Sequence, residues 1–501
     1  MADDMGFADL GCYGSEVQTP NIDGLAKRGI RFRNFYNTAR CCPTRASLLT
    51  GLYSHQAGVG HMTADWGKPG YRGTLNQNCV TIAEVLRQAG YGCYISGKWH
   101  VAGPGKRENF PLQRGFDKYF GTLAGGGNYY YPQQLMRGNE FITAPEQGFF
   151  YTDAIAENAI RFLDEHKADR ARDPFFLYVP FTAPHWPLHA LEPEIAKYRD
   201  VFRSGWDEAR TRRHRRQIDL GVVSEKWALS PRDPVVPAWA EAPNKEWEIE
   251  RMSVYAAQID RLDQNVGKIL RQLPDNTLVL FLSDNGSSAE VIKDTPAAWR
   301  NTPFKVRGGN DPTIMPGPRD TFQSCGPSWA QVSNTPFRRY KMWVHEGGIA
   351  APLIAAWPGR IRKPGSFTDS TGHVIDLMAT CCDAAGVSYP KTFQGRTITP
   401  LEGRSLVPLI EGRPKENHPR LFWEHEGNQA VREGRWKLVR LHDKPWELYD
   451  IMADRTELHD LAAKEPAVVA RLSEQYAAWM KRVGALPYDE ARPASKPATS
   501  H

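Results

Sequence analysis

Four oxygen-bearing side chains form two short clusters that could hold a metal ion. Asp3 and Asp4 stand together near the start of the chain, and Asp284 and Asn285 stand together in its second half. Oxygen ligands without a softer partner suit a hard divalent cation such as calcium. Either pair alone is more often a turn or a helix cap, so the metal hypothesis depends on where the two pairs lie in the fold.

Lysine and histidine side chains elsewhere could bind an anion and move a proton. Lys98 and His100 are two residues apart, so in an extended segment both point to the same side. His185 lies between two prolines, and Lys341 lies upstream of a Gly-Gly pair. Each of these residues alone could also be a solvent-exposed side chain. Together, a lysine could hold an anion by its charge while a neighbouring imidazole transfers a proton.

Helix patterns alternating with apolar runs predict the elements that position these residues. Helices are predicted over 20–28, 81–90, 153–166, 246–273 and 376–385, and strands over 91–96, 174–179, 277–282 and 351–357. This alternation predicts an α/β fold with a large, mostly parallel sheet between helices. Such sheets bind ligands at the carboxyl ends of their strands. The polar clusters follow the predicted strands, which favours the functional interpretation.

The composition excludes several classes of protein. The 501 residues are 41% apolar and 24% charged, and this length predicts one large domain and one smaller domain. A net charge of +6 argues against a dedicated nucleic-acid binder. The arginine-rich run 210–216 is predicted to be a solvated helix face. The eight cysteines include no Cys-x-x-Cys motif, so they indicate neither a disulfide framework nor a zinc ribbon. The sequence also lacks an apolar run long enough to span a membrane.

The segment 41–51 resembles the signature of the sulfatase family. It contains Cys-x-Pro-x-Arg followed by Leu-Thr-Gly, although Cys41 alone could also be a buried cysteine near a helix start. Other segments that match the family lie before and after this signature, and all of them occur in sulfatase order: 2–6, 19–23, 97–100, 183–185, 283–286, 341 and 346–348. The resemblance is closest to bacterial arylsulfatases, spans almost the whole chain, and implies the alkaline-phosphatase-like fold.

The resemblance implies a modified nucleophile and a calcium ion. A maturation enzyme would oxidise Cys41 to formylglycine, whose hydrate supplies the hydroxyl that attacks sulfur. The implied calcium ligands are Asp3, Asp4, Asp284, Asn285 and the modified Cys41.

The same resemblance implies roles for the remaining matching residues. Arg45 would hold the hydrate, and Lys98 and Lys341 would bind the sulfate oxygens. His185 would protonate the leaving alcohol, and His100 would deprotonate the second hydroxyl so that sulfate leaves.

The natural substrate stays open at this point between aryl and carbohydrate sulfate esters. Candidates for shaping the substrate pocket are Asn128, Tyr129, Trp186, Trp343, His345 and His425. A phosphatase or phosphonate monoester hydrolase of the same superfamily is the alternative enzyme. A non-catalytic binder of sulfated glycans is a further alternative, and the intact set of catalytic residues counts against it.

The predicted domains are a catalytic domain over 1–390, a small α+β subdomain over 391–490 and a disordered tail over 491–501. The subdomain should contain antiparallel strands at 436–440 and 446–450 and a helix at 466–482. Paired carboxylates such as Asp3-Asp4 normally stand at the end of a buried strand, but only Met1 and Ala2 precede them here. We therefore expect that the first strand of the sheet is missing. The resemblance implies a periplasmic or secreted protein, although the chain shows no export signal.

Overall fold

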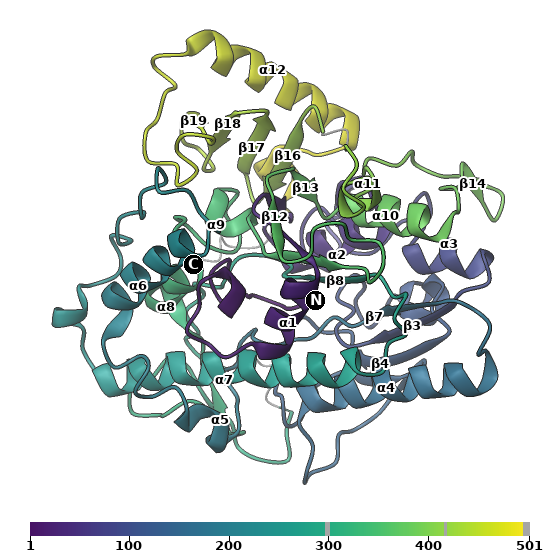
Figure 1. Ribbon diagram of the computed structural model, residues 1–501, viewed down its shortest axis with the longest axis horizontal. Coiled ribbons are helices and arrows are strands. Elements are labelled where there is room, and N and C mark those ends of the chain that lie inside the picture. Colours follow the sequence, from purple (N-terminus) through teal and green to yellow (C-terminus); the bar gives the residue numbers. More distant parts are fainter. Residues whose placement is uncertain (296–300, 415–417, 494–501) are drawn as a thin grey trace.

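The computed structural model describes residues 1–295, 301–414 and 418–493 (Figure 1). One central sheet has the strand order β6-β5-β4-β3-β7. In it, β3 is parallel to both β4 and β7, whereas β5 is antiparallel to β4 and β6. The bounds of these strands are β3 (Gly92–Ser96), β4 (Lys118–Thr122), β5 (Leu135–Arg137), β6 (Glu140–Phe141) and β7 (Phe175–Tyr178).

A second central sheet has the strand order β12-β1-β11-β8. Here β11 runs antiparallel to both β1 and β8, so this sheet is mixed, whereas β1 and β12 are parallel. The bounds are β1 (Ile30–Phe32), β8 (Val279–Leu282), β11 (Leu353–Ala356) and β12 (Ser366–Thr368). The predicted α/β class is confirmed, with its strands divided between two hydrogen-bonded sheets.

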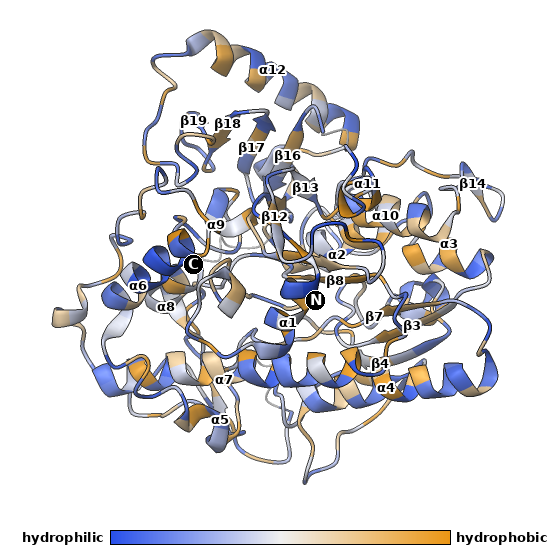
Figure 2. Cartoon of the chain, in the orientation of Figure 1, coloured by the Kyte–Doolittle hydropathy of each residue, from blue (hydrophilic) through white to orange (hydrophobic). Residues whose placement is uncertain are grey.

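Helices cover both faces of these sheets (Figure 1). On one side α1 (Pro20–Arg28) and α4 (Tyr151–Asp169) contact the strands, and α7 (Lys245–Leu270) packs against both helices. On the other side α3 (Ile82–Gln88) contacts β3, and α2 (Cys41–Thr50) and α10 (Asp376–Ala385) pack against α3. Hydrophobic and hydrophilic residues share α4 and α7 (Figure 2), as expected for helices with one buried side.

Local signals in the sequence explain where these helices begin and end. Pro20 occupies the first turn of α1 and Gly29 follows its last residue. At α3, Glu84 N–H donates to Thr81 Oγ1 at 3.1 Å and Thr81 N–H donates to Glu84 Oε2 at 2.8 Å, which forms a capping box.

The arginine-rich run lies on α6 (Gly205–Asp219), and the prediction of a solvated face is wrong for two of its residues. Arg213 is fully buried and binds Asp9 at 2.8 Å and Glu16 at 2.9 Å. Arg210 is buried too and donates to the Ser230 carbonyl oxygen at 2.8 Å. Positions three apart share one side of a helix, so these two arginines face inward.

The C-terminal part forms a four-stranded antiparallel sheet in the order β16-β17-β18-β19, with α12 (Pro466–Val483) packed along it. Its strands are β16 (Leu421–His425), β17 (Asn428–Glu433), β18 (Trp436–Arg440) and β19 (Glu447–Asp450). The predicted tail starts at Ala491, which ends α13 (Tyr488–Ala491), and residues 494–501 lie outside the described residues.

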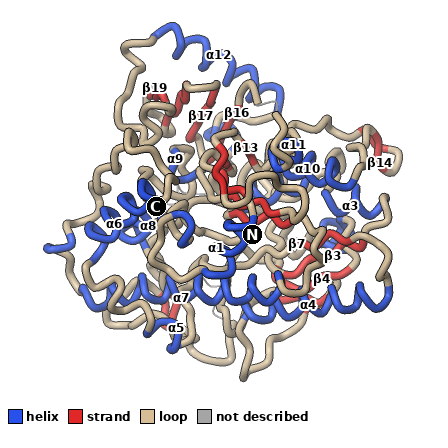
Figure 3. Tube along the Cα trace, viewed as in Figure 1, coloured by secondary structure: helices blue, strands red, loops and turns tan. Residues whose placement is uncertain are grey.

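Loops and short elements join these layers (Figure 3). The further helices are α5 (Glu192–Ala196), α8 (Gly326–Ser333), α9 (Glu346–Ile349), α11 (Val407–Ile410), η1 (Gly11–Tyr13), η2 (Arg107–Asn109), η3 (Pro111–Arg114) and η4 (Trp239–Glu241). Two-residue strands pair as β2 (Phe35–Tyr36) with β13 (Gly372–His373), β9 (Arg307–Gly308) with β10 (Thr321–Phe322), and β14 (Thr392–Phe393) with β15 (Arg396–Thr397). Among the described helices, none combines the length and apolar character needed to cross a bilayer.

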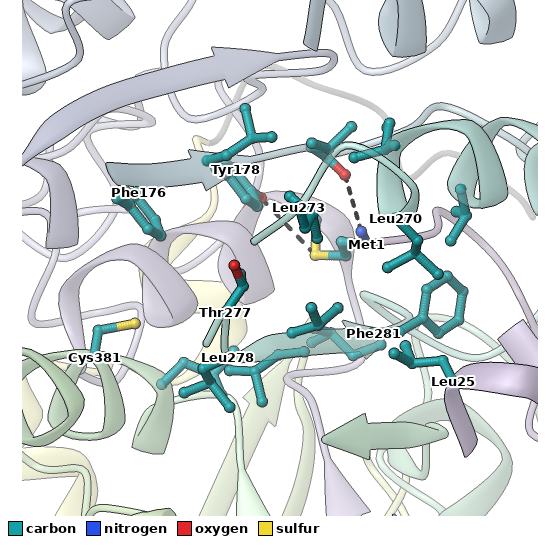
Figure 4. A pocket seen from close by; sticks show the side chains of 18 of the residues that line it. Met1, Leu25, Phe176, Tyr178, Leu270, Leu273, Thr277, Leu278, Phe281 and Cys381 are labelled. Atoms are coloured by element: carbon teal, nitrogen blue, oxygen red, sulfur yellow. Dashed lines mark hydrogen bonds between the residues drawn. The ribbon is translucent and has the colours of Figure 1, made fainter. Parts of the chain in front are cut away.

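The first two residues connect the edges of the two central sheets. Met1 N–H donates to the Val179 carbonyl oxygen at 2.9 Å, beyond the end of β7. Ala2 N–H donates to the Leu282 carbonyl oxygen at 2.8 Å, at the end of β8. Beyond Met1, a pocket between β7 and β8 is lined mainly by apolar side chains, including Phe176 and Phe281 (Figure 4).

We propose that this pocket accepts one more apolar strand joined to Met1. An added strand would bury the facing side chains of β7 and β8, at about 25 cal/mol per Å² of apolar surface. An N-terminal extension of five β-branched residues should therefore raise the melting temperature relative to a Gly/Ser extension of equal length. Equal melting temperatures of the two extended proteins would contradict this proposal.

Candidate active site

The structure brings the ten predicted catalytic and metal-binding residues together where the central strands end. Ala2 pairs in parallel with Ser283, which places Asp3-Asp4 beside Asp284-Asn285. Lys98 and His100 follow β3, and His185 follows β7. Each side chain is at most 7% exposed: Asp3, Asp4, Cys41, Arg45, Lys98, His100, His185, Asp284, Asn285 and Lys341.

The carboxylates at this edge are held by hydrogen bonds and cations. Asp284 Oδ1 accepts from the Asp4 backbone N–H at 3.2 Å, and Asn285 Nδ2 donates to Asp4 Oδ1 at 2.6 Å. Arg45 Nη2 lies 2.8 Å from Asp284 Oδ2 and 3.3 Å from Asp3 Oδ2. Lys98 Nζ also binds Asp3 Oδ2. Asp3 and Asp284 are therefore balanced by cations from two other elements, α2 and the loop after β3.

Two oxygen atoms of this cluster fit a further positive ligand. Neither Asp3 Oδ1 nor Asn285 Oδ1 has a hydrogen-bond partner within the described ranges, and both atoms are buried. Burial and the charge of Asp284 raise the pKa of Asp3 well above its usual value, against the opposing charges of Lys98 and Arg45. Buried acceptors are normally paired, so these oxygens suit a hard cation.

Cys41 begins helix α2 next to a second thiol and an imidazole. Its Sγ, the Sγ of Cys42 and a ring nitrogen of His100 all lie within 4.8 Å of one another. A hydrogen bond from Cys42 and the charges of Lys98 and His100 lower the pKa of the Cys41 thiol well below 9.0, although burial acts the other way. The site therefore stabilises negative charge at the position of Cys41 Sγ, as a helix N-terminus also does.

Lys341 lies between two carboxylates and one imidazole. Its Nζ is 2.9 Å from Asp4 Oδ2, 3.0 Å from Glu290 Oε2 and 3.4 Å from His185 Nε2. The charges of Asp4 and Glu290 raise the pKa of Lys341 despite its burial, so the side chain remains an ammonium ion.

The two histidines are oriented differently. His185 Nδ1 is 2.6 Å from the Trp186 carbonyl oxygen, so Nδ1–H donates and Nε2 is left to face Lys341. His100 Nδ1 is buried without a partner in the described part of the chain, and His100 has a left-handed φ of 53°. Burial lowers the pKa of His185 to about 3 and that of His100 to about 4, so both rings are neutral at pH 7.

A glycine loop after β4 lies against both histidines. A Cβ atom at Gly125 would lie 2.2 Å from His100 Cε1, and one at Gly126 would lie 2.9 Å from His185 Cε1. A side chain at either position would displace the neighbouring ring. Sequence reasoning missed these glycines because their role depends on the path of the loop.

Glu290 and Arg40 also belong to the site but were not predicted. Glu290 accepts hydrogen bonds from Lys341 and, at 2.9 Å, from Trp186 Nε1, and it lies 3.4 Å from Arg40 Nη2. The charges of Lys341 and Arg40 keep the pKa of Glu290 well below its usual value, although burial opposes them. The position of Arg40 directly before Cys41 was the one available signal in the sequence.

Two of the six predicted pocket residues contact His185. The Tyr129 hydroxyl donates to the His185 carbonyl oxygen at 2.8 Å, and the Trp186 ring lies 4.5 Å from the His185 ring.

The other four predicted pocket residues have different surroundings. Asn128 Nδ2 donates to the Arg319 carbonyl oxygen at 2.6 Å. Trp343 stands edge-on to Tyr340, and His345 is buried with its Nε2 3.5 Å from Glu447 Oε2. His425 is fully buried beside His61, with ring centroids 5.6 Å apart.

Two family models match the chain. The model described as Sulfatase matches residues 1–387, and the model described as N-sulphoglucosamine sulphohydrolase, C-terminal, matches residues 339–482. A Schizosaccharomyces pombe protein named as an uncharacterized sulfatase is 34% identical, over 97% of this chain and 93% of its own length. The arylsulfatase of Klebsiella aerogenes is 31% identical, over 84% of this chain and 93% of its own length.

Solved structures agree with this assignment at the level of the fold. The crystal structure of Ps i-CgsB matches with a TM-score of 0.67 and 24% identity, and it covers 96% of this chain and 91% of that chain. The sequence matches show that the chain belongs to the sulfatase family, and the structural match shows that it shares the fold.

Proposed function

We propose that the buried site around Cys41 hydrolyses sulfate monoesters. As a member of the sulfatase family, the protein is a sulfuric ester hydrolase, and that family uses a formylglycine and a metal ion. One observation carries the assignment to this site. A thiol, two imidazoles and three cationic side chains converge on a single buried carboxylate cluster.

The residues present fit both implied groups. Calcium would be held by Asp3, Asp4, Asp284 and Asn285, because two of their oxygens have no partner among the described residues. Formylglycine would be made from Cys41 by a formylglycine-generating enzyme. When bound, calcium supplies Lewis-acid polarisation, and formylglycine supplies a hydrated aldehyde oxygen as nucleophile.

Fixed positive charges would bind the sulfate group. Lys98 and Lys341, which would bind the sulfate oxygens, are held by Asp3 and Asp4. Arg45, which would hold the hydrate, is held by Asp284. Because these cations are oriented before substrate arrives, they can stabilise the negative charge of the transition state without reorganisation.

His185 would serve as the general acid for the leaving alcohol. Its Nδ1–H is committed to the Trp186 carbonyl oxygen, so Nε2 is the nitrogen available for proton transfer. A bound sulfate ester brings negative charge, which raises the pKa of a neighbouring imidazole and favours its protonated form. The proton at Nε2 can then pass to the alcohol oxygen.

His100 would serve as the base that deprotonates the second hydroxyl of the hydrate. Its ring lies beside Cys41, is neutral at pH 7, and has a ring nitrogen without a partner in the described structure. A neutral imidazole within reach of the nucleophile's position can accept a proton there.

The first prediction of this assignment concerns turnover and Cys41. Protein co-expressed with a formylglycine-generating enzyme should release sulfate from 4-nitrophenyl sulfate, while Cys41→Ala should reduce the rate at least about 10³-fold by removing the nucleophile. N-acetylglucosamine 6-sulfate should be tested in parallel, because the relatives include proteins named arylsulfatase and N-acetylglucosamine-6-O-sulfatase.

A matched phosphate ester separates the two enzymatic interpretations. We expect faster release of sulfate than of phosphate. Preferential phosphate release, or equal sulfate release by Cys41→Ala protein, would contradict the proposed function.

The second prediction concerns Glu290 as a positioning residue for Lys341. Glu290→Gln removes a charge that raises the pKa of both Lys341 and His185. We expect kcat to fall about tenfold, equivalent to about 1.4 kcal/mol, and the alkaline limb of its pH profile to move to lower pH.

Glu411→Gln is the matched control, since Glu411 pairs with Arg360 and Arg413 away from the described site. It should leave kcat and the pH profile unchanged. A Glu290→Gln protein with lowered melting temperature but an unshifted pH profile would argue for a purely structural role of Glu290.

A further inference from the structure

A second group of potential metal ligands lies where the catalytic part meets the C-terminal sheet. It consists of His61, from the loop after α2, and His425 and Glu426, from the β16–β17 hairpin. We name it the His61–His425–Glu426 cluster. His61 Nε2 is 2.8 Å from Glu426 Oε1, and His425 Nε2 is 3.8 Å from the same oxygen. Both imidazoles therefore converge on one carboxylate.

The hydrogen bonding of this cluster is incomplete. His425 is fully buried, and neither of its ring nitrogens has a hydrogen-bond partner among the described residues. His61 Nδ1 is likewise buried and unpaired there. A buried polar atom without a partner destabilises the folded protein. Of these nitrogens, His425 Nε2 faces Glu426 Oε1, so it is the one available to a ligand shared with Glu426 and His61 Nε2.

Neighbouring groups hold the cluster in a defined geometry. Trp66 stacks on the His61 ring with centroids 4.0 Å apart, and the His61 and His425 ring planes are within 11° of parallel. Glu426 and Gly427 form the hairpin turn with φ values of 50° and 80°. The left-handed conformation is unfavourable for glutamate, so the turn places Glu426 beside the rings at a local cost.

The protonation states suit a cation. Burial lowers the pKa of His425 to about 3, so its ring is neutral at pH 7. The hydrogen bond with His61 holds the pKa of Glu426 below its usual value despite burial, so Glu426 is ionised. The charge of Arg40 also acts on both residues, but Arg40 is itself paired with Glu290.

We propose that the His61–His425–Glu426 cluster binds a zinc-class transition-metal ion. Zinc bonds of about 2.0–2.1 Å in tetrahedral geometry place neighbouring ligand atoms about 3.3 Å apart. The observed separations of 2.8 Å and 3.8 Å lie on either side of this value. Two imidazoles and one carboxylate leave the fourth position for water or another ligand. The nitrogen ligands separate this site from the all-oxygen calcium site.

A bound ion would link two parts of the chain. His61 belongs to the segment after α2, the helix that begins with Cys41, whereas His425 and Glu426 belong to the C-terminal sheet. The ion would therefore fix the hairpin against the catalytic part of the molecule.

Cobalt(II) and zinc titrations of the full chain test this proposal. They should use a Cys41→Ala/Cys42→Ala background with calcium present, because Cys41, Cys42 and His100 form a competing group of ligands. One equivalent of cobalt should give the visible spectrum of a four-coordinate ion without thiolate charge-transfer bands. Zinc should displace it and raise the melting temperature.

His425→Ala and Glu426→Gln should each weaken zinc binding at least tenfold. His442→Ala is the matched control, since His442, Asp443 and Asp489 form a more exposed group of potential ligands. It should leave zinc affinity unchanged. Failure of the background protein to bind cobalt or zinc saturably would overturn the proposal, even if a cluster variant did not fold. Binding that survives both cluster substitutions, or that is lost in His442→Ala protein, would also overturn it.

Discussion

The compensation of buried negative charge is the constraint on which the rest of the site depends. Asp3, Asp4 and Asp284 are fully or almost fully buried, and an ionised carboxylate is costly to bury unless it is paired. The pairing cations come from α2, from the loop after β3 and from the loop before α9. Removing one partner of a buried ion pair typically costs about 3–5 kcal/mol. The carboxylates therefore couple the positions of segments far apart in the sequence, and the same pairs hold the cations proposed to bind sulfate.

A second buried charge network attaches the C-terminal sheet to the catalytic part. Glu346 in α9 pairs with Lys437 and Arg455 at 2.9 Å each, and it accepts from the Tyr36 hydroxyl at 3.0 Å. The adjoining glycines allow the backbone to approach closely, because a Cβ atom at Gly348 would lie 1.8 Å from the Trp343 carbonyl oxygen. The Glu-Gly-Gly motif therefore has a structural reason that is separate from catalysis.

Much of the fold could be predicted because its signals are local. The structure places α1, α10 and β18 within the predicted bounds, since prolines, glycines and apolar periodicity mark their ends. The direction of β11 could not be predicted, because an apolar run carries no information about the orientation of its neighbours. The inward-facing Arg213 was missed because its partners Asp9 and Glu16 are distant in sequence.

The same distinction applies to the candidate site. Residues in motifs, such as Lys98 and His100, could be identified from the sequence. Glu290 and the paired His61 and Glu426 could not, because loop paths bring them to their partners. The side chain of Asn128 hydrogen-bonds to backbone groups of Arg319 and Tyr130, and its place in the substrate pocket stays a prediction.

Calorimetric titration of calcium into metal-free protein shows whether the buried carboxylate cluster is a site for a hard cation. We expect one calcium ion bound per chain, with affinity at least about tenfold weaker in Asp284→Asn protein, since the ion loses one charged oxygen ligand. Folded wild-type protein that shows no saturable calcium binding, or an Asp284→Asn protein that binds equally well, would contradict it.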